Sequence, residues 1–162
     1  MSKKVERGPE VSEKMMTSGV LVGRIDHALD PKRRFTIPSE WRAAMGNPAY
    51  VYVMPDRKER CLNLIPPAEM EARLERLREK VLFDPALNGA YQAIGENSEQ
   101  LTLDCQGRIR VSDRLLRFAN LTTTVAMVGS IRMIKLWNEK ALAPADKIDQ
   151  SALDRALEEA GF

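Results

Sequence analysis

The sequence predicts an α+β fold in which two similar halves pack about a pseudo-twofold axis. The first observation is a nine-residue segment from Asp30 to Pro38 that returns in similar form from Asp104 to Ser112. Both copies read as an acidic residue, a tight turn, an arginine, a short alternating strand and the start of a helix. The second observation is that the offset of 74 residues (104 − 30) persists, since Trp41 aligns with Leu115. A solenoid needs about three repeats, so two copies favour a paired arrangement.

Composition indicates an ordinary soluble globular chain of 162 residues, with 44% hydrophobic and 30% charged residues. No apolar run approaches the roughly 20 residues that a membrane helix needs, and the charged N-terminus lacks the apolar core of a secretory signal. Cys61 and Cys105 form no CxxC pair, which predicts reduced, semi-buried thiols in a cytosolic protein. The net charge of +2 is small, but basic residues gather at the two turns and predict a cationic face.

The first half is predicted to follow a mobile tail over residues 1–18 and to end at residue 68. β-branched and apolar residues predict a strand from Gly19 to Leu29, which leads into the first turn. In the short strand after that turn, Phe35 and Ile37 share one face and Thr36 lies on the other. The remaining elements are a helix capped by Ser39 or opened by Pro38, breakers at 46–48, and strands over 50–54 and 61–65.

Residues 69–96 are predicted to be connecting helices, because the apolar period changes there from two to that of a helix. The apolar positions of the first helix step by four, three and four, as a narrow seam of Met70, Leu74, Leu77 and Val81. Asp84-Pro85 interrupts this helix, and a second helix is predicted from Ala86 to Ile94.

The second half, residues 97–142, repeats the order of the first half. Its predicted elements are a strand over 99–103, the second turn, a strand with Ile109 and Val111, a helix capped by Ser112, and a hairpin over 125–137. Leu64 aligns with Leu136 at an offset of 72 (136 − 64), because the first hairpin loop is two residues longer. A short helix from Asn138 to Leu142 and an acidic helix from Asp146 to Ala160, within 143–162, complete the chain.

The two turns leave two interpretations open. Asp30 and Arg34, like Asp104 and Arg108, can form a local ion pair that only stabilises a turn, worth roughly 0–1 kcal/mol at a surface. Alternatively, both arginines face outward as forks that bind phosphate or guanine. Spacing alone favours the local ion pair. Repetition shifts the balance toward the second interpretation, because two equivalent arginines suit a repeating polymer.

One position breaks the repeat. Gly107 can supply the positive φ that is usual in a hairpin turn with a bulge, whereas the first copy has Arg33 at this place. If Arg33 is left-handed, its conformation costs on the order of 1 kcal/mol relative to glycine. A further positive charge at the first turn is one reason to retain it.

Other chemistry finds little support in the residues. His27 is the only histidine, and no nucleophile–base pair, metal cluster or glycine-rich phosphate loop accompanies it, so neither an enzyme nor a cofactor is predicted. Cys61 and Cys105 do not complete a zinc site without carboxylates. Trp41 and Trp137 lie on apolar faces and are predicted to belong to the core.

The repeated Asp-x-x-x-Arg turn, followed by a strand, Pro or Ser and a helix, resembles the MraZ transcriptional regulator family of the AbrB-type superfamily. The second half carries the resemblance best, through Leu103 to Ile109, Val125 to Gly129 and Lys135 to Asn138, and the whole covers roughly residues 19 to 142. It departs from the family at Arg33, which replaces the usual turn glycine, and in its N-terminal extension.

The resemblance implies two AbrB-like swapped-hairpin units, 19–68 and 97–142, in a pseudo-twofold β-α-β barrel. It further implies a cytoplasmic, nucleoid-associated regulator of the bacterial division and cell-wall gene cluster, without a small-molecule substrate. Such proteins assemble into homo-oligomeric rings on promoter direct repeats. The residues expected to contact DNA are Arg34, Arg108, Lys32, Arg33 and Arg110, with Asp30, Asp104 and Gly107 shaping the turns. The alternative is an AbrB-like antitoxin-type module that acts mainly through a protein partner.

Overall fold

The computed structural model describes residues 19–141 and 149–162, and within them the fold is α+β, with antiparallel strands and five α-helices. The tail predicted over residues 1–18 lies outside the described residues. The elements are β1 (Arg24–Ala28), β2 (Arg34–Thr36), α2 (Ser39–Ala44), β3 (Tyr50–Pro55), β4 (Leu62–Ile65), α3 (Pro67–Phe83), the 3-10 turn η2 (Pro85–Leu87), α4 (Gly89–Asn97), β5 (Glu99–Thr102), β6 (Arg108–Arg110), α5 (Asp113–Ala119), β7 (Thr124–Gly129), β8 (Ile134–Trp137) and α6 (Gln150–Ala160). No helix among the described residues is long and apolar enough to span a bilayer.

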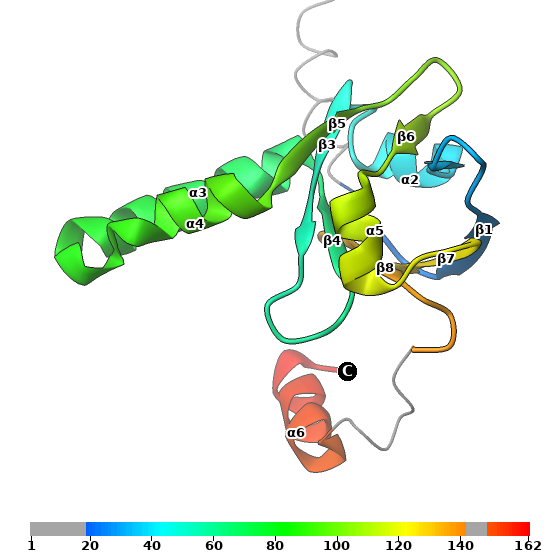
Figure 1. Cartoon of the computed structure of the whole chain (residues 1–162). Helices are drawn as coiled ribbons and strands as arrows, with labels where there is room; N and C mark the ends of the chain where they lie inside the picture. The colour runs from blue at the N-terminus through cyan, green and yellow to red at the C-terminus, as the bar shows by residue number, and fades with distance from the viewer. Residues whose placement is uncertain (1–18, 142–148) are drawn as a thin grey trace, which may run out of the picture.

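Two antiparallel layers enclose the core (Figure 1). Six strands form one sheet in the order β1-β7-β8-β4-β3-β5, and β2 pairs with β6 in a two-stranded ribbon, called the ribbon below. Phe35 and Ile109 at the centre of the ribbon are each 1% exposed and pack against the inner face of the sheet. Trp41 of α2 and Leu115 of α5 belong to the same core, which confirms that Trp41 is a core residue. Trp137 is also buried, in a smaller cluster with Cys61 and Ala126.

The strand registers repeat at the offset seen in the sequence. β1 pairs with β7 so that Ala28 lies opposite Thr124, and β5 pairs with β3 so that Thr102 lies opposite Tyr50. Adding 74 to 28 and to 50 gives 102 and 124, so the two pairings are equivalent. The first strand of each half therefore pairs with the hairpin of the other half. The ribbon obeys the same rule, since Phe35 lies opposite Ile109 (109 − 35 = 74).

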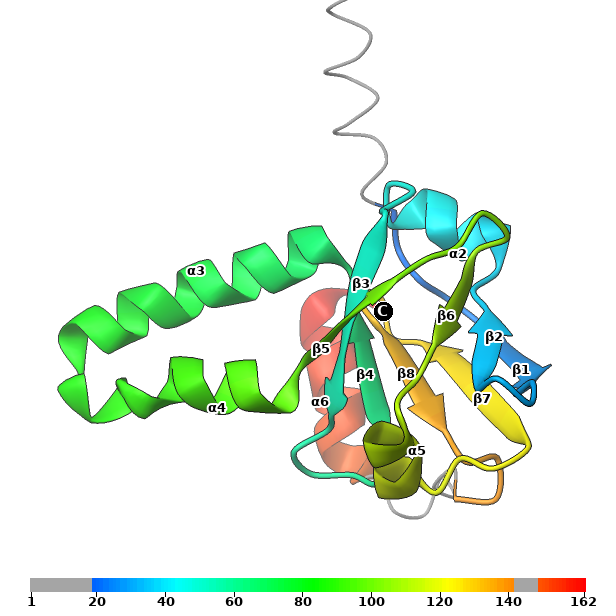
Figure 2. The same ribbon diagram turned by 45° about the horizontal axis from the view of Figure 1, so that its top comes forward.

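The connecting helices α3 and α4 run side by side away from the sheet (Figures 1 and 2). Together with η2 they are called the arm below. Met70 at the base of α3 is buried, and a hollow of about 340 Å³ between the helices is lined by Leu74, Tyr91 and Ile94. At the tip, Leu82 is 69% and Phe83 is 89% exposed. The arm therefore carries apolar surface that the described chain leaves uncovered.

Several element predictions are wrong in detail, and the backbone gives the reasons. The strand expected from Gly19 begins only at Arg24, because Gly23 has a φ of +93° and breaks the extended chain. Leu21 keeps a single isolated bridge to Ile131. The second connecting helix is split at Asn88 into η2 and α4.

Helix ends show similar differences. Ser39 is not a cap, because Pro38 occupies the N-cap of α2 without a side-chain bond, whereas Ser112 accepts from the Leu115 N–H and caps α5 as predicted. In place of the helix from Asn138, the described part of that segment contains a turn closed by the Ala141 N–H on the Asn138 carbonyl. α6 begins at Gln150, capped by Asp149.

Candidate nucleic-acid interface

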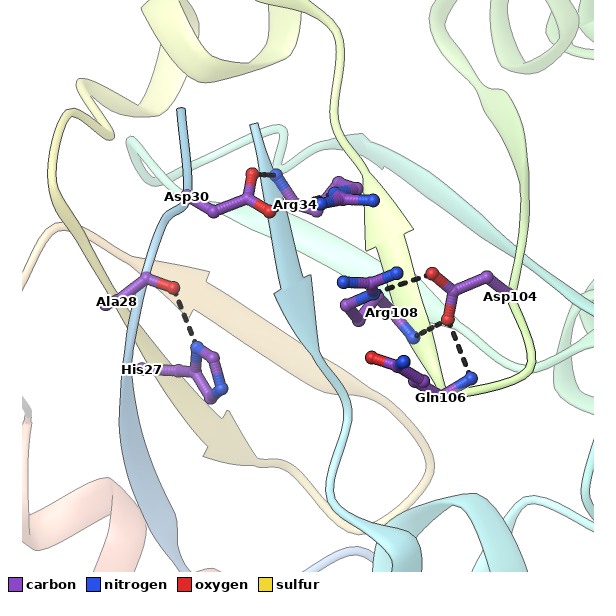
Figure 3. Close-up of polar contacts among 7 residues, drawn as sticks. All are labelled: His27, Ala28, Asp30, Arg34, Asp104, Gln106 and Arg108. Atoms are coloured by element: carbon purple, nitrogen blue, oxygen red, sulfur yellow. Dashed lines mark hydrogen bonds and ion pairs between the residues drawn. The ribbon is translucent and has the colours of Figure 1, made fainter. Parts of the chain in front are cut away.

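Each of the two turns is closed by one aspartate. The Asp30 carboxylate accepts from the backbone N–H of Arg34 at 2.8 Å and from its Nε at 2.8 Å. In the second turn, Asp104 accepts from the backbone N–H of Arg108 at 2.9 Å and from its Nε at 2.7 Å (Figure 3). Both arginine side chains remain 28% exposed. The ion pair is therefore real in both copies, and it uses Nε rather than the terminal nitrogens of the guanidinium.

This geometry fixes the direction of each guanidinium. Among the described residues, neither arginine has a hydrogen bond on its Nη1 or Nη2. Four terminal N–H donors per guanidinium thus stay available for a planar acceptor such as phosphate or the guanine edge. The two interpretations of the turns are compatible, because the aspartate orients the same arginine that presents its outer donors.

The carboxyl groups respond to these bonds. The pKa of Asp30 and that of Asp104 lie below the usual range, chiefly because each carboxylate accepts the backbone N–H of its arginine and secondarily because it pairs with the guanidinium. A lowered pKa in the folded state contributes stability above the unfolded value of about 3.9. That contribution is lost as the pH falls through the folded pKa.

We expect a D30N/D104N variant to be less stable than the natural chain at pH 7. The difference in the free energy of unfolding should shrink as the pH falls below about 4, because the natural carboxyls then become protonated and are as uncharged as the asparagines. Urea unfolding between pH 3 and pH 7 measures this. A difference that stays constant across the range would show that these two carboxyls are not linked to folding through their ionisation.

The ribbon brings four of the relevant side chains to one surface. Because Phe35 and Ile109 point into the core, strand alternation places Arg34, Thr36, Arg108 and Arg110 on the opposite, outer face. Arg34 lies directly across from Arg110, and Thr36 across from Arg108. Lys32 is exposed in the first turn, next to this face.

Arg33 is left-handed, with a φ of 64°, like Gly107 in the second turn with a φ of 78°. Its Nε pairs with Asp113 of α5 at 2.8 Å, so part of its charge is already neutralised by the protein. The second turn differs because Arg42 lies over it: a Cβ on Gly107 would stand 2.5 Å from the Arg42 Cζ. Arg42 is held there by its Nε, which donates to the Ile37 carbonyl. Glycine is thus favoured at 107 by its positive φ, and any side chain there would also have to displace the guanidinium of Arg42.

We expect a near-neutral effect on stability from a substitution at Arg33 and a clear loss of stability from one at Gly107. Arg33→Gly removes left-handed strain of about 1 kcal/mol, offset by the loss of an exposed ion pair worth roughly 0–1 kcal/mol and by added freedom in the unfolded chain. Gly107→Ala should destabilise by about 1–2 kcal/mol. Chemical denaturation measures both. If Arg33→Gly stabilises and leaves DNA affinity unchanged, Arg33 is not retained for binding.

The structure also shows where the histidine and the two cysteines lie. His27 Nδ1 lies 2.7 Å from the carbonyl oxygen of its neighbour Ala28, on β1 (Figure 3). The expectation of two semi-buried thiols is wrong, because Cys61 has no exposed surface and Cys105 is exposed in the second turn. Burial raises the pKa of the Cys61 thiol to about 12. Within the residues that the structure covers, no three metal-binding side chains gather in one place.

Two contacts at the turns were not predicted from the sequence. Arg42 over Gly107 and Asp113 beside Arg33 both come from helices that follow the ribbon strands. The repeat offers one signal for the contact between Asp113 and Arg33. Asp113 of the second half corresponds to Ser39 of the first (113 − 74), so only the second half has a carboxylate at this position, and only the first turn has an arginine to pair with it.

Comparisons with known proteins agree on one family, although no family model matches the chain. The chain is similar to "Transcriptional regulator MraZ" of Rhodospirillum rubrum, at 34% identity over 130 residues, covering 75% of this chain and 81% of the relative. It is 24% identical over 145 residues to the protein of that name from Clostridium acetobutylicum, covering 88% of this chain and all of the relative. For the Syntrophobacter fumaroxidans protein the identity is 28% over 136 residues, 84% and 91% of the two chains.

These relatives are named as regulators of transcription, not as enzymes. The similarity extends through both halves and the connecting helices. From the repeated turns and from these relatives, it follows that this chain belongs to the MraZ family of transcriptional regulators.

Proposed function

We propose that the chain binds promoter DNA through the outer face of the ribbon, as a sequence-specific regulator of the bacterial division and cell-wall gene cluster. The observation that carries this proposal is the equivalent pair of aspartate-held arginines, Arg34 and Arg108, on one exposed two-stranded surface. A two-stranded β-ribbon fits the major groove of B-DNA, where arginine recognises guanine with two hydrogen bonds. The site of action is then the cytoplasm, on the nucleoid.

Roles within the surface follow from its charges. Arg34 and Arg108 are positioned for base edges or phosphate, because their aspartates limit side-chain freedom before DNA arrives. Lys32 and Arg110 suit phosphate contacts. Arg33 contributes less, because its ion pair with Asp113 partly neutralises its charge. Asp30 and Asp104 orient the arginines. Their carboxylates carry the same charge as a phosphate, so they are not expected to contact the DNA themselves.

We also propose that residues 19–68 and 97–142 are two AbrB-like units joined by 69–96 and that they close into a pseudo-twofold β-α-β barrel. The support is the equivalence of the β1–β7 and β5–β3 registers at an offset of 74. The central pair β4–β8 has the same property: Asn63 lies opposite Lys135, and the difference of 72 is that of the shortened loop. The C-terminal segment 143–162, with α6, is a separate addition to the second unit.

Assembly into a ring is proposed for a different reason. The tip of the arm exposes Leu82 and Phe83, and large exposed apolar side chains on a projecting element favour contact with another copy. A ring would present equivalent ribbons at regular intervals. Modest single contacts then add by avidity when the operator holds direct repeats at the matching spacing.

The decisive experiment is footprinting on the DNA upstream of the chain's own gene, combined with the salt dependence of affinity. We expect protection of short repeats in the same orientation and an affinity that falls steeply with salt, as phosphate contacts require. Absence of any protected site, together with capture of one defined protein partner, would favour the antitoxin-type alternative instead.

A further inference from the structure

The strand residues on the outer face of the ribbon are nearly symmetric, and they depart from symmetry at one pair of positions. The local twofold passes between Phe35 and Ile109, as the flanking bonds confirm: Ile37 N–H donates to the Gly107 carbonyl at 2.9 Å, and Val111 N–H donates to that of Arg33 at 3.0 Å. This operation exchanges Arg34 with Arg108. It also exchanges Thr36 with Arg110, so a neutral side chain on one strand corresponds to a cation on the other.

The two ends of the ribbon therefore differ in charge. At the end near the first turn, Arg34 and Arg110 lie directly opposite each other, with Lys32 and Arg33 beside them. At the other end, Arg108 lies opposite Thr36. Arg42 also reaches the second turn, but its Nε is bound to the Ile37 carbonyl and its guanidinium packs on the Gly107 backbone.

Arg110 has no structural explanation among the described residues. Like charges directly opposite each other in an antiparallel ladder are destabilising, and Arg34 is such a neighbour. Arg34 is paired with Asp30, whereas exposed Arg110 has no hydrogen bond or ion pair within the described chain. Two carboxylates line the hollow of about 380 Å³ that Arg110 borders, but both are engaged by other arginines: Glu99 by Arg114 and Asp113 by Arg33.

An extra cation at one end has a consequence for DNA. The phosphates of a duplex are themselves related by local twofold axes, so a symmetric ribbon docks equally well in either direction along the groove. We propose that Arg110, opposed by Thr36 at the symmetric position, is the residue that makes each chain bind its repeat in one direction. This inference rests on the proposed DNA-binding function and assigns to Arg110 the choice of orientation, separate from the affinity supplied by Arg34 and Arg108.

The test uses the full chain and two operators that differ only in the direction of one of two repeats, at unchanged spacing. In a cyclic assembly all ribbons point the same way, so the inverted operator presents one repeat backwards. For the natural chain we expect roughly tenfold weaker binding to the inverted operator, the factor of a single arginine contact. Electrophoretic mobility shift at fixed salt measures the ratio.

Two opposite substitutions both restore symmetry to the strand residues, while the first turn keeps Lys32 and Arg33 where the second turn has Gln106 and Gly107. Arg110→Thr gives threonine at both strand positions, and Thr36→Arg gives arginine at both. Each should lower the ratio of affinities clearly below that of the natural chain, toward one. Thr36→Arg adds a charge and retains overall affinity, so weak binding by Arg110→Thr does not obscure the result. A ratio near ten in both variants would overturn the role of Arg110. A ratio near one in the natural chain would show that the chain binds its repeat in either direction. In both cases, binding to the direct repeats would still support the proposed DNA-binding function. Failure of the natural chain to bind either operator would instead reject the DNA-binding function itself.

Discussion

Replacing both held arginines, in an R34A/R108A variant, is expected to abolish operator binding at physiological salt. Each good arginine contact to a base or phosphate contributes about 1–3 kcal/mol, so the pair accounts for roughly 30-fold to 10⁴-fold in affinity per chain. The slope of log affinity against log salt should also fall by about one for each phosphate contact removed. Titration of operator DNA at several salt concentrations measures both effects.

A matched control separates this result from general loss of charge. Arg24 and Arg78 are also exposed and also paired with carboxylates, Asp26 and Glu75, but they lie on β1 and on the arm. An R24A/R78A variant thus removes the same formal charge away from the ribbon and should retain most of the affinity. If the control loses as much binding as R34A/R108A, the interface is not the ribbon.

A single acidic substitution at the tip of the arm, Phe83→Asp, is expected to prevent assembly of the proposed ring and leave single chains. Phe83 is 89% exposed in one chain, and transferring a phenyl group from water into an interface would contribute about 1.5–3 kcal/mol at each contact of the proposed ring. A buried unpaired carboxylate adds a further penalty. Mass photometry or light scattering measures the assembly, and affinity for an array of repeats should fall while that for one repeat is retained.

The C-terminal helix provides the comparison for this experiment. Leu153 of α6 is 38% exposed, so Leu153→Asp introduces the same charge at another partly uncovered apolar side chain. We expect the assembly of this variant to be unchanged. The opposite pattern, with assembly lost in Leu153→Asp and kept in Phe83→Asp, would assign the contact between copies to α6.

Elements whose cause is local were predicted best. The alternation of Phe35, Thr36 and Ile37, the cap at Ser112 and the helical seam from Met70 each depend on neighbours within a few residues, and the structure has them as expected. Errors arose where one backbone angle decides an element. Gly23 shortens β1 because of its positive φ, and no apolar pattern signals that angle.

The candidate site divides in the same way. The aspartate–arginine pairs span four residues, so both follow from the repeated turn. Contacts across the twofold do not: Asp113 lies 80 residues from Arg33, and the distance between Arg42 and Gly107 is 65 residues. Only the register of β2 against β6 brings these side chains together. The comparison with Gly107 leaves the φ of Arg33 open, and the structure shows that it is positive.

The exchange of strands between halves has a consequence for synthesis on the ribosome. β1 ends at Ala28, but its partner β7 begins at Thr124, so 96 further residues (124 − 28) must be made before the two can pair. At about 5–20 residues per second this takes roughly 5–20 s, during which β1 lacks its neighbouring strand. Pairing over such a sequence separation also slows folding, because the chain loses the entropy of closing the loop before the stabilising contacts form. The N-terminal half therefore becomes native only when the C-terminal half arrives.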